Sequence, residues 1–363
     1  MARLSADLDT LLNDKLTGLR RSDRFLAGLL DAPRVTFVSH VQPDPDSLGS
    51  MLGLAHLVES RLGVPTRITR DGLINRAENR AMVELLGLDL TRVEDLDFEP
   101  GEAVVMVDSQ PNTGRHSFGD VPLYAVIDHH TTPGDLEDVP FVDVRPALGA
   151  TATLATRYLI EQDVSIPPRV ATALMYGIET EVSGYPREAT PMDDGALHFL
   201  FPLADRSILA QIRNARLPHS HFEVLLQALQ SSFIYDRLII SWVTHLPQPE
   251  QAAEVVDFMV RFEKVDWALC GGVCGDKLIL SLRTSLHGVQ AGELFRNVVG
   301  ELGKAGGHDR RAGGFVRLPN DSLTAVDAAQ AEIRSRILKA LKYEDAQGQR
   351  LVPLREMLQN LQA

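Results

Sequence analysis

The amino-acid sequence predicts an α/β protein of two domains, and three observations support this fold class. First, 363 residues allow roughly two domains of ~150 residues each. Second, strand-length apolar segments alternate with helical segments in two separate blocks, as in mostly parallel sheets. Third, a helical stretch at 206–235 separates the blocks. We therefore predict an N-terminal α/β domain with a mostly parallel sheet flanked by helices and a smaller C-terminal α/β domain, joined by a helical linker.

The first block begins with an amphipathic helix pattern in residues 1–31, where leucines recur among charged side chains. We expect this helix to pack on the first domain, which we assign to residues 32–205. The predicted elements of that domain are strands at 34–40, 103–107 and 123–127, and helices at 47–62, 151–161 and 168–178. The second and third of these strands are apolar throughout, as expected for strands covered on both faces.

The second domain is assigned to residues 236–345, and a polar tail follows at 346–363. Its predicted elements are strands at 237–245, 266–273 and 277–283, and helices at 250–262, 290–302 and 321–342. A glycine-rich segment at 306–314 separates the last two helices. We expect a further strand directly after that segment.

The composition excludes several classes of protein. Proteins that bind long nucleic acids usually carry a basic surface, and a net charge of -13 argues against such a surface. Any nucleic acid that this protein binds should therefore be short. The chain begins without an apolar signal segment and has no run of ~18 apolar residues, so we expect a cytoplasmic protein without membrane contact. Cys270 and Cys274 are too few for a structural zinc site, and we interpret them as packing residues.

Four clusters of acidic and histidine side chains stand out by their positions in the predicted domain. Three follow the ends of predicted strands, and the fourth ends a predicted helix. They are His40 with Asp44 and Asp46, then Asp108, then Asp128 with His129 and His130, and finally Glu181. Ligands of open parallel sheets gather outside the carboxyl ends of the strands, near a topological switch point. We therefore expect the three strand-end clusters to converge on one edge of the sheet.

Converging carboxylates and imidazoles are costly unless a cation lies between them. A pair of divalent metal ions would remove that cost, and mixed aspartate and histidine ligation suits manganese, with magnesium or cobalt as alternatives. Each cluster taken singly also fits ordinary turn or capping chemistry. The coincidence of three strand-end clusters in one domain favours the metal site.

These motifs resemble the successive motifs of the DHH phosphoesterase superfamily. The matching segments are His40-x-x-x-Asp44-x-Asp46-x-x-Gly49-Ser50, Val107-Asp108-Ser109 and Asp128-His129-His130, and Gly306-Gly307-His308 resembles the glycine-rich motif of the DHH-associated C-terminal domain. The resemblance covers roughly residues 32–320. Within the superfamily the chain is most similar to bacterial nanoRNases, which degrade short oligoribonucleotides and remove the 3′-phosphate of phosphoadenosine phosphate.

The resemblance implies a ligand set for two metal ions. His40 and Asp44 would bind one ion, Asp46 and His129 would bind the second, and Asp108 would bridge both. Such a pair of ions hydrolyses phosphate esters with an activated water, without a covalent protein intermediate.

Three further residues complete the implied centre. His130 would face the substrate phosphate, and Asp128 would hold a neighbouring imidazole in orientation. Glu181 departs from the family, which has Asp at this position as a further ligand of the second ion. Because Glu has one more methylene group than Asp, the resemblance does not determine how tightly the second ion binds at this position.

The resemblance also assigns substrate binding to the second domain, where Arg283 lies at the end of a predicted strand and can hold a phosphate bidentately. A surface salt bridge is the alternative for Arg283, and a tight turn is the alternative for the glycine run. The candidate substrate-binding residues are Arg283, Ser285, Gly306, Gly307, His308 and Arg115.

The expected substrates are RNA or DNA oligonucleotides of about two to five nucleotides, or small nucleotides. An inorganic pyrophosphatase or polyphosphatase, a linear-dinucleotide phosphodiesterase and a non-catalytic nucleotide-binding protein remain alternatives. The sequence does not determine the oligomeric state, and a homodimer is one possible assembly.

Overall fold

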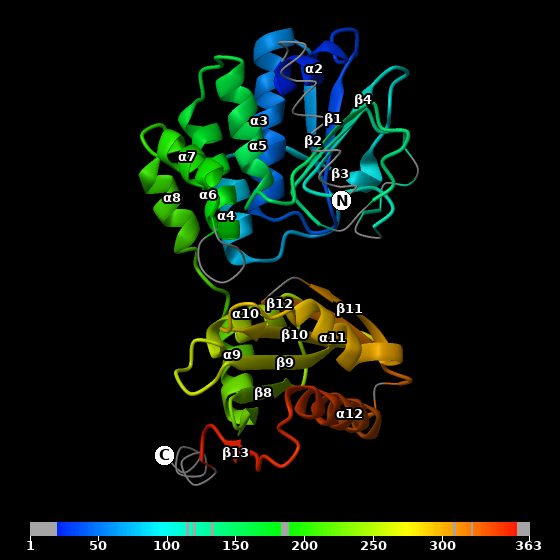
Figure 1. The fold of residues 1–363 in the computed structure, drawn as a ribbon, viewed down its shortest axis with the longest axis vertical. Coiled ribbons are helices and arrows are strands. Elements are labelled where there is room, and N and C mark those ends of the chain that lie inside the picture. Colours follow the sequence, from blue (N-terminus) through cyan, green and yellow to red (C-terminus); the bar gives the residue numbers. More distant parts are fainter. Residues whose placement is uncertain are drawn as a thin grey trace. The chain divides into compact units, whose positions relative to one another are not determined.

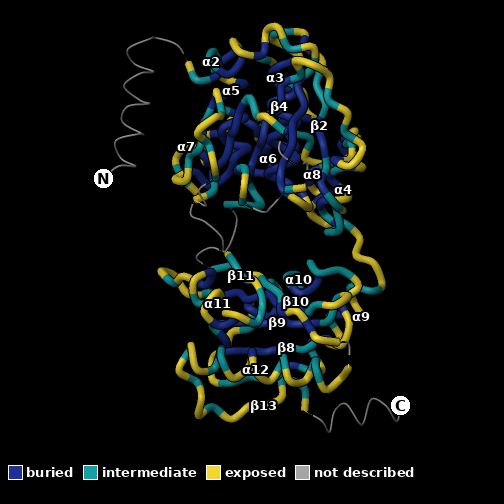
Figure 2. The backbone as a smooth tube through the Cα atoms, turned by 90° about the vertical axis from the view of Figure 1, so that its right-hand side faces the viewer, coloured by how far each residue is buried: buried dark blue, intermediate teal, exposed yellow. Residues whose placement is uncertain are grey.

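The computed structural model of the chain describes residues 20–113, 116–117, 119, 121–131, 134–182, 189–307, 310–320 and 322–353. Contacts divide the chain into two compact units, Met1–Ala215 and Arg216–Ala363, and each has its own buried interior (Figure 2). The division falls inside the stretch 206–235. Most of the predicted N-terminal helix, residues 1–19, lies outside the described residues, and the first described helix is α2 (Arg21–Ala27).

The first unit is built on a six-stranded sheet with the order β3-β2-β1-β4-β5-β6, in which every pairing is parallel. The strands are β1 (Val35–Val38), β2 (Thr66–Arg70), β3 (Leu90–Arg92), β4 (Ala103–Val107), β5 (Ala125–Asp128) and β6 (Phe141–Val144). The predicted mostly parallel sheet is confirmed. The sequence analysis did not predict β2, β3 and β6.

Helices cover one face of this sheet, and connecting segments cover the other (Figure 1). The remaining helices of the unit are α3 (Pro45–Leu62), α4 (Ala77–Leu85), α5 (Thr151–Glu161), α6 (Pro168–Val182), α7 (Pro191–Leu200) and α8 (Arg206–Arg213), with a 3-10 turn at Val93–Asp95. On the other face, Val104 and Met106 of β4 pack against Leu123 and Phe98 from connecting segments.

Two glycines let α6 lie close against α3. A Cβ atom on Gly49 would stand 2.6 Å from the main-chain oxygen of Ala173, and one on Gly177 would stand 2.8 Å from that of Pro45. Real Cβ atoms do not approach that closely, so larger side chains would force the two helices apart. The close approach places the end of α6 beside the first turn of α3.

The strand order reverses between β1 and β4, which are neighbours although β2 and β3 lie between them in the chain. Such a switch point opens a crevice at the carboxyl ends of the two strands. His40 follows β1 and Asp108 follows β4. The topology therefore brings these two side chains to the same crevice.

The second unit contains a seven-stranded mixed sheet with the order β11-β12-β10-β9-β8-β7-β13. Only β8 and β9 pair in parallel. The strands are β7 (Phe233–Tyr235), β8 (Leu238–Val243), β9 (Trp267–Cys274), β10 (Lys277–Thr284), β11 (Gly303–Gly307), β12 (Arg311–Arg317) and β13 (Gln349–Arg350). This second α/β unit confirms the predicted two-domain fold class.

The helices of the second unit are α9 (His219–Ser231), α10 (Gln251–Met259), α11 (Ala291–Val299) and α12 (Leu323–Leu341), with a 3-10 turn at Gly300–Leu302. Phe295 of α11 and Ile333 of α12 are fully buried in the core of the unit. Cys270 is buried in β9, and burial raises the pKa of its thiol to about 12, so it packs as an apolar side chain. Among the described helices, none is both long and apolar enough to span a membrane.

The described residues of the glycine-rich segment belong largely to two strands, β11 and β12. Gly306 and Gly307 belong to β11, which pairs with β12. Gly307 has a φ of 148°, and a Cβ on Gly292 of α11 would stand 2.3 Å from the carbonyl oxygen of Gly307. Glycine is needed here because α11 and β11 touch through their main chains.

Candidate metal centre

Asp108 lies at the middle of a buried polar cluster at the carboxyl edge of the first sheet. It follows β4 in the left-handed region, with a φ of 58°, which Asp tolerates better than most residues. Its side chain is 1% exposed. The two carboxylate oxygens face different groups of side chains.

The first group contains His40 and Asp44. Nε2 of His40 lies 3.6 Å from Oδ2 of Asp108 and 3.8 Å from Oδ2 of Asp44. Nδ1 of His40 lies 2.9 Å from the carbonyl oxygen of Val41, which directs Nε2 into the cluster. Asp44 caps α3 by accepting a hydrogen bond of 3.0 Å from the main-chain N–H of Ser47. Each of the three side chains offers one ligand atom within 4.8 Å of the other two.

The second group lies on the Oδ1 side of Asp108. Nε2 of His129 is 3.4 Å from Oδ1 of Asp108 and 3.6 Å from Oδ2 of Asp46. Nδ1 of His130 is 3.6 Å from the same oxygen of Asp108. Asp108, His129 and His130 form a second set whose ligand atoms lie within 4.8 Å of one another.

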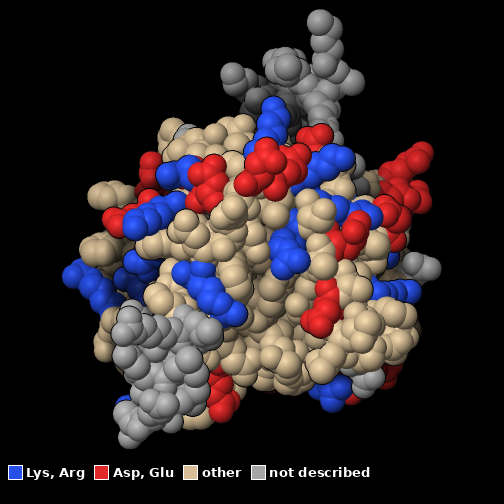
Figure 3. Space-filling model, turned by 90° about the horizontal axis from the view of Figure 1, so that it is seen from below, with Lys and Arg blue, Asp and Glu red and all other residues tan. Residues whose placement is uncertain are grey.

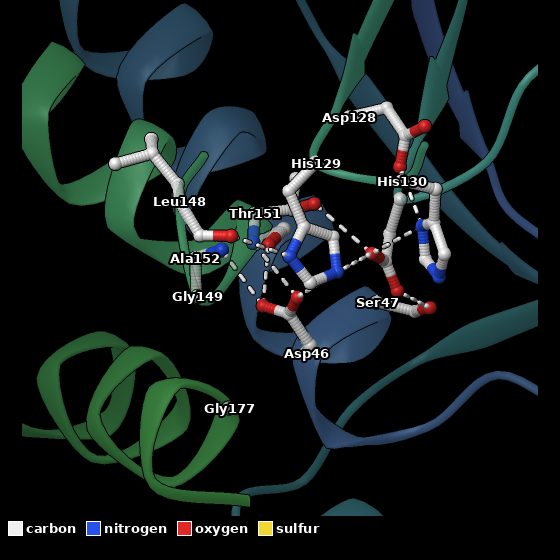
Figure 4. A network of polar contacts seen from close by, with 12 residues as sticks. Asp46, Ser47, Asp128, His129, His130, Leu148, Gly149, Thr151, Ala152 and Gly177 are labelled. Atoms are coloured by element: carbon white, nitrogen blue, oxygen red, sulfur yellow. Dashed lines mark hydrogen bonds and ion pairs between the residues drawn. The ribbon is translucent and has the colours of Figure 1, made fainter. Parts of the chain in front are cut away.

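The start of α5 fixes Asp46, which is completely buried. Its Oδ2 accepts a hydrogen bond of 2.8 Å from the N–H of Thr151, and Oδ1 accepts one of 2.7 Å from the N–H of Ala152 (Figure 4). These N–H groups have no partner within their own helix, so a carboxylate satisfies them well. Asp46 therefore joins the first turn of α3 to the first turn of α5.

A hydrogen-bonded pair orients the third histidine of the cluster. Oδ1 of Asp128 lies 2.8 Å from Nδ1 of His130, and Oδ2 accepts a hydrogen bond of 2.8 Å from the amide of Gln110. Burial alone would raise the pKa of Asp128, but the His130 and Gln110 contacts hold it below its usual range. The pair fixes the ring orientation of His130 (Figure 4).

The carboxylates of the cluster are in unlike electrostatic environments. Burial and the charges of Asp108, Glu181 and Asp44 raise the pKa of Asp46 well above its usual range. Burial would also raise the pKa of Asp108, but its contacts with His40, His130 and His129 hold that pKa well below the usual range.

The donor set fits divalent cations. Carboxylates crowd together here with imidazoles whose ring nitrogens face them, and hard or borderline ions prefer oxygen and imidazole ligands. An ion between the groups would favour their unprotonated forms and offset the crowding of charge that raises the pKa of Asp46. The two sets whose ligand atoms lie close enough to hold an ion are His40, Asp44 and Asp108, and Asp108, His129 and His130. Asp46 lies beside His129 but belongs to neither set, so its implied role as a ligand remains a prediction.

Glu181 lies near the end of α6, partly exposed. It is near enough for its charge to raise the pKa of Asp46. Within the described part of the chain, however, it belongs to neither compact set of ligand atoms. The implied role of Glu181 as a ligand remains a prediction.

The residues predicted to bind substrate in the second unit are placed in part. Arg283 is 7% exposed and its guanidinium is engaged within the unit, 2.6 Å from Oδ1 of Asp257 and 3.1 Å from Oγ of Ser281. Ser285 follows the end of β10 and donates to the carbonyl oxygen of Asp266. Gly306 and Gly307 belong to β11, and His308 lies outside the described residues. Arg115, the one candidate from the range of the first unit, also lies outside them.

The structure adds residues that the sequence analysis left out or considered only in passing. Ser47 and Thr151 contact Asp108, and Gln110 contacts Asp128. Asp193, far along the chain, accepts a hydrogen bond of 3.0 Å from the N–H of Gly149 just before α5. Ser47 and Gln110 lie within three residues of a predicted ligand, which was the only signal in the sequence.

Residues 34–178 match the model of the DHH family, N-terminal domain. This match contains every strand of the first sheet and all the residues of the cluster except Glu181. The chain contains a DHH-family domain.

Two curated relatives and one solved structure extend this comparison. An uncharacterized protein of Methanocaldococcus jannaschii is 30% identical over 311 residues, 84% of this chain and 63% of that protein. A probable manganese-dependent inorganic pyrophosphatase of Streptococcus agalactiae is 26% identical over 147 residues, 40% of this chain and 47% of the relative. The chain therefore spans less than two thirds of either relative.

The solved structure is an exopolyphosphatase-related protein from Bacteroides fragilis. Its TM-score is 0.69 at 16% identity, and the match covers 88% of this chain and 97% of that chain. At this identity the likeness shows a shared fold. The fold of this chain is therefore known from an experimentally determined structure.

Proposed function

We propose that the protein is a metal-dependent phosphoesterase that holds two divalent ions, manganese first among them, at the cluster around Asp108. The observation that carries the proposal is the division of the Asp108 carboxylate. One oxygen faces His40 and the other faces His129. The manganese-dependent relative supports the choice of metal.

Two such ions supply a water of lowered pKa and stabilise the charge that develops on a phosphoryl group. The protein's own residues provide the geometry. Asp128 holds His130 through Nδ1, which turns Nε2 away from Asp128. In the imidazolium form of His130, which carries a proton on each ring nitrogen, the proton on Nε2 can be donated to a phosphoryl oxygen.

The proposed substrates are oligonucleotides of about two to five nucleotides, which would yield nucleoside monophosphates. 3′-Phosphoadenosine 5′-phosphate, which would yield AMP, is a second substrate of this class. A net charge of -13 supports short substrates. On the face drawn in Figure 3, basic side chains are interspersed with acidic ones among the described residues, which also fits a local binding site.

Hydrolysis of inorganic pyrophosphate is the second candidate activity. It is favoured by the pyrophosphatase of Streptococcus agalactiae. That relative aligns with only 40% of this chain, so it supports the proposed metal chemistry more strongly than it supports pyrophosphate as the substrate.

Product analysis tests the proposal. The purified full chain is incubated with manganese and labelled RNAs of about two to five nucleotides, phosphoadenosine phosphate or pyrophosphate. We expect mononucleotides from the RNAs, only when manganese is present. Cleavage of pyrophosphate alone would establish the second candidate, and the absence of metal-dependent cleavage on every substrate would refute the proposed function.

A further inference from the structure

Two buried hydroxyl groups each hold one oxygen of the Asp108 carboxylate. Oγ of Ser47 donates a hydrogen bond of 2.7 Å to Oδ2, and Oγ1 of Thr151 donates one of 2.9 Å to Oδ1. Ser47 and Thr151 are both completely buried. They lie in the first turns of α3 and α5, so the two donors come from different elements.

This arrangement fixes the plane of the carboxylate. The terminal torsion of an aspartate is broad and only weakly restricted by itself. With one donor on each oxygen, rotation of the carboxylate of Asp108 would break both hydrogen bonds. Oδ2 therefore stays 3.6 Å from Nε2 of His40, and Oδ1 stays 3.4 Å from Nε2 of His129.

We propose that Ser47 and Thr151 are positioning residues that divide the Asp108 carboxylate between two metal ions. This inference rests on the proposed function. Each carboxylate oxygen offers two acceptor positions, so it can accept one hydrogen bond from a hydroxyl group and still bind an ion. Ser47 would then govern the ion beside His40, and Thr151 would govern the ion beside His129.

Removing the hydroxyl of Thr151 leaves the other contacts of that residue in place, whereas removing the hydroxyl of Ser47 also removes its contact with Nε2 of His40, at 2.9 Å. The N–H of Ser47 holds Asp44 at 3.0 Å, and the N–H of Thr151 holds Asp46 at 2.8 Å. These are main-chain contacts, which Ser47→Ala and Thr151→Val retain. Any change in metal binding then reports on the hydroxyl groups alone.

The test is calorimetric titration of the metal-free full chain with manganese chloride, in variants that keep one ion each. In a His129→Ala background, we expect Ser47→Ala to lower the affinity of the remaining ion roughly 10- to 100-fold, since loss of a residue that orients a ligand costs about that much. Thr151→Val should change it little. In a His40→Ala background, the two effects should be exchanged.

Two variants complete the design. Thr151→Ser keeps the hydroxyl and should restore wild-type affinity. Thr156→Val removes a buried hydroxyl from the same helix, one that donates to the carbonyl oxygen of Ala152 at 2.7 Å, and should leave manganese binding unchanged. If Ser47→Ala fails to fold, the comparison of Thr151→Val with Thr151→Ser in the two backgrounds still tests the division of Asp108.

The outcomes separate the inference from the proposed function. Equal loss at both ions in either variant, or no loss in both, would overturn the division of Asp108 while leaving the metal centre in place. A wild-type chain that binds no manganese would overturn the metal centre and the division together.

Discussion

The main-chain N–H of Thr151 donates a hydrogen bond of 2.8 Å to Oδ2 of Asp46, which lies 105 positions earlier in the chain. The contact joins the start of α5 to the start of α3. It immobilises a carboxylate that lies 3.6 Å from Nε2 of His129. A candidate ligand is thus held in place by the fold before any ion binds.

We expect Asp108→Asn to abolish metal-dependent hydrolysis, lowering the rate roughly 100-fold or more because both ions lose a charged ligand. Asn tolerates the left-handed conformation of this residue, so the fold should persist. The rate is measured at saturating manganese, and circular dichroism checks the fold. A folded variant that keeps more than about a tenth of the wild-type rate would contradict the shared-ligand assignment.

We expect Glu181→Asp to lower the manganese concentration needed for half-maximal activity. The shorter side chain restores the aspartate of the related family at the site of the second ion. Glu179→Asp is the matched control, because Glu179 lies on the same helix and pairs with Arg213. An unchanged or higher manganese requirement in Glu181→Asp would show that Glu181 is not a ligand or is already well placed.

We expect Arg283→Ala to destabilise the second unit by about 1–3 kcal/mol, because the buried acceptors Oγ of Ser281 and the carbonyl oxygen of Leu282 would lose a charged donor. Denaturant unfolding measures the change. Arg310→Ala is the control, since Arg310 contacts His287 at an exposed position and should contribute little.

Hydrolysis of a small artificial ester should survive in Arg283→Ala, because the candidate ligands lie in the first unit. Equal stability of the two variants would contradict this structural role of Arg283.

Stability at low pH should depend on Glu102. Burial alone would raise its pKa, but hydrogen bonds from Arg34, Thr36 and the N–H of Glu99, with the charge of Arg67, lower it from 4.5 to about 2. A lowered folded-state pKa contributes stability above pH 4.5, and the contribution is lost as the pH falls from there towards 2.

We therefore expect Glu102→Gln to lower the free energy of unfolding at pH 7 by up to about 3 kcal/mol. The difference from wild type should shrink between pH 4.5 and pH 2. Urea unfolding across this range measures it. Glu99→Gln, an exposed neighbour that pairs with Arg34, is the control. Parallel pH profiles for wild type and Glu102→Gln would exclude this role.

Sequence patterns located some elements to the residue and missed others for physical reasons. The run at 103–107 is apolar throughout, because β4 is buried on both faces, and it was placed correctly. Thr66–Arg70 has a single apolar side chain, Ile68, and its arginines and threonines mask the strand β2. β6 has only four residues, and a buried aspartate, Asp143, interrupts its apolar side chains.

The sequence by itself determined that carboxylates and imidazoles follow β1, β4 and β5, because the order of apolar runs and polar strand ends is local information. Convergence at one edge followed from the rule that parallel strands share a carboxyl edge. Only the tertiary structure decided which oxygen of Asp108 faces His40 and which faces His129. That choice depends on the hydroxyls of Ser47 and Thr151, which lie 61 and 43 positions from Asp108. Contacts over such separations depend on how helices pack on the sheet, which no local pattern encodes.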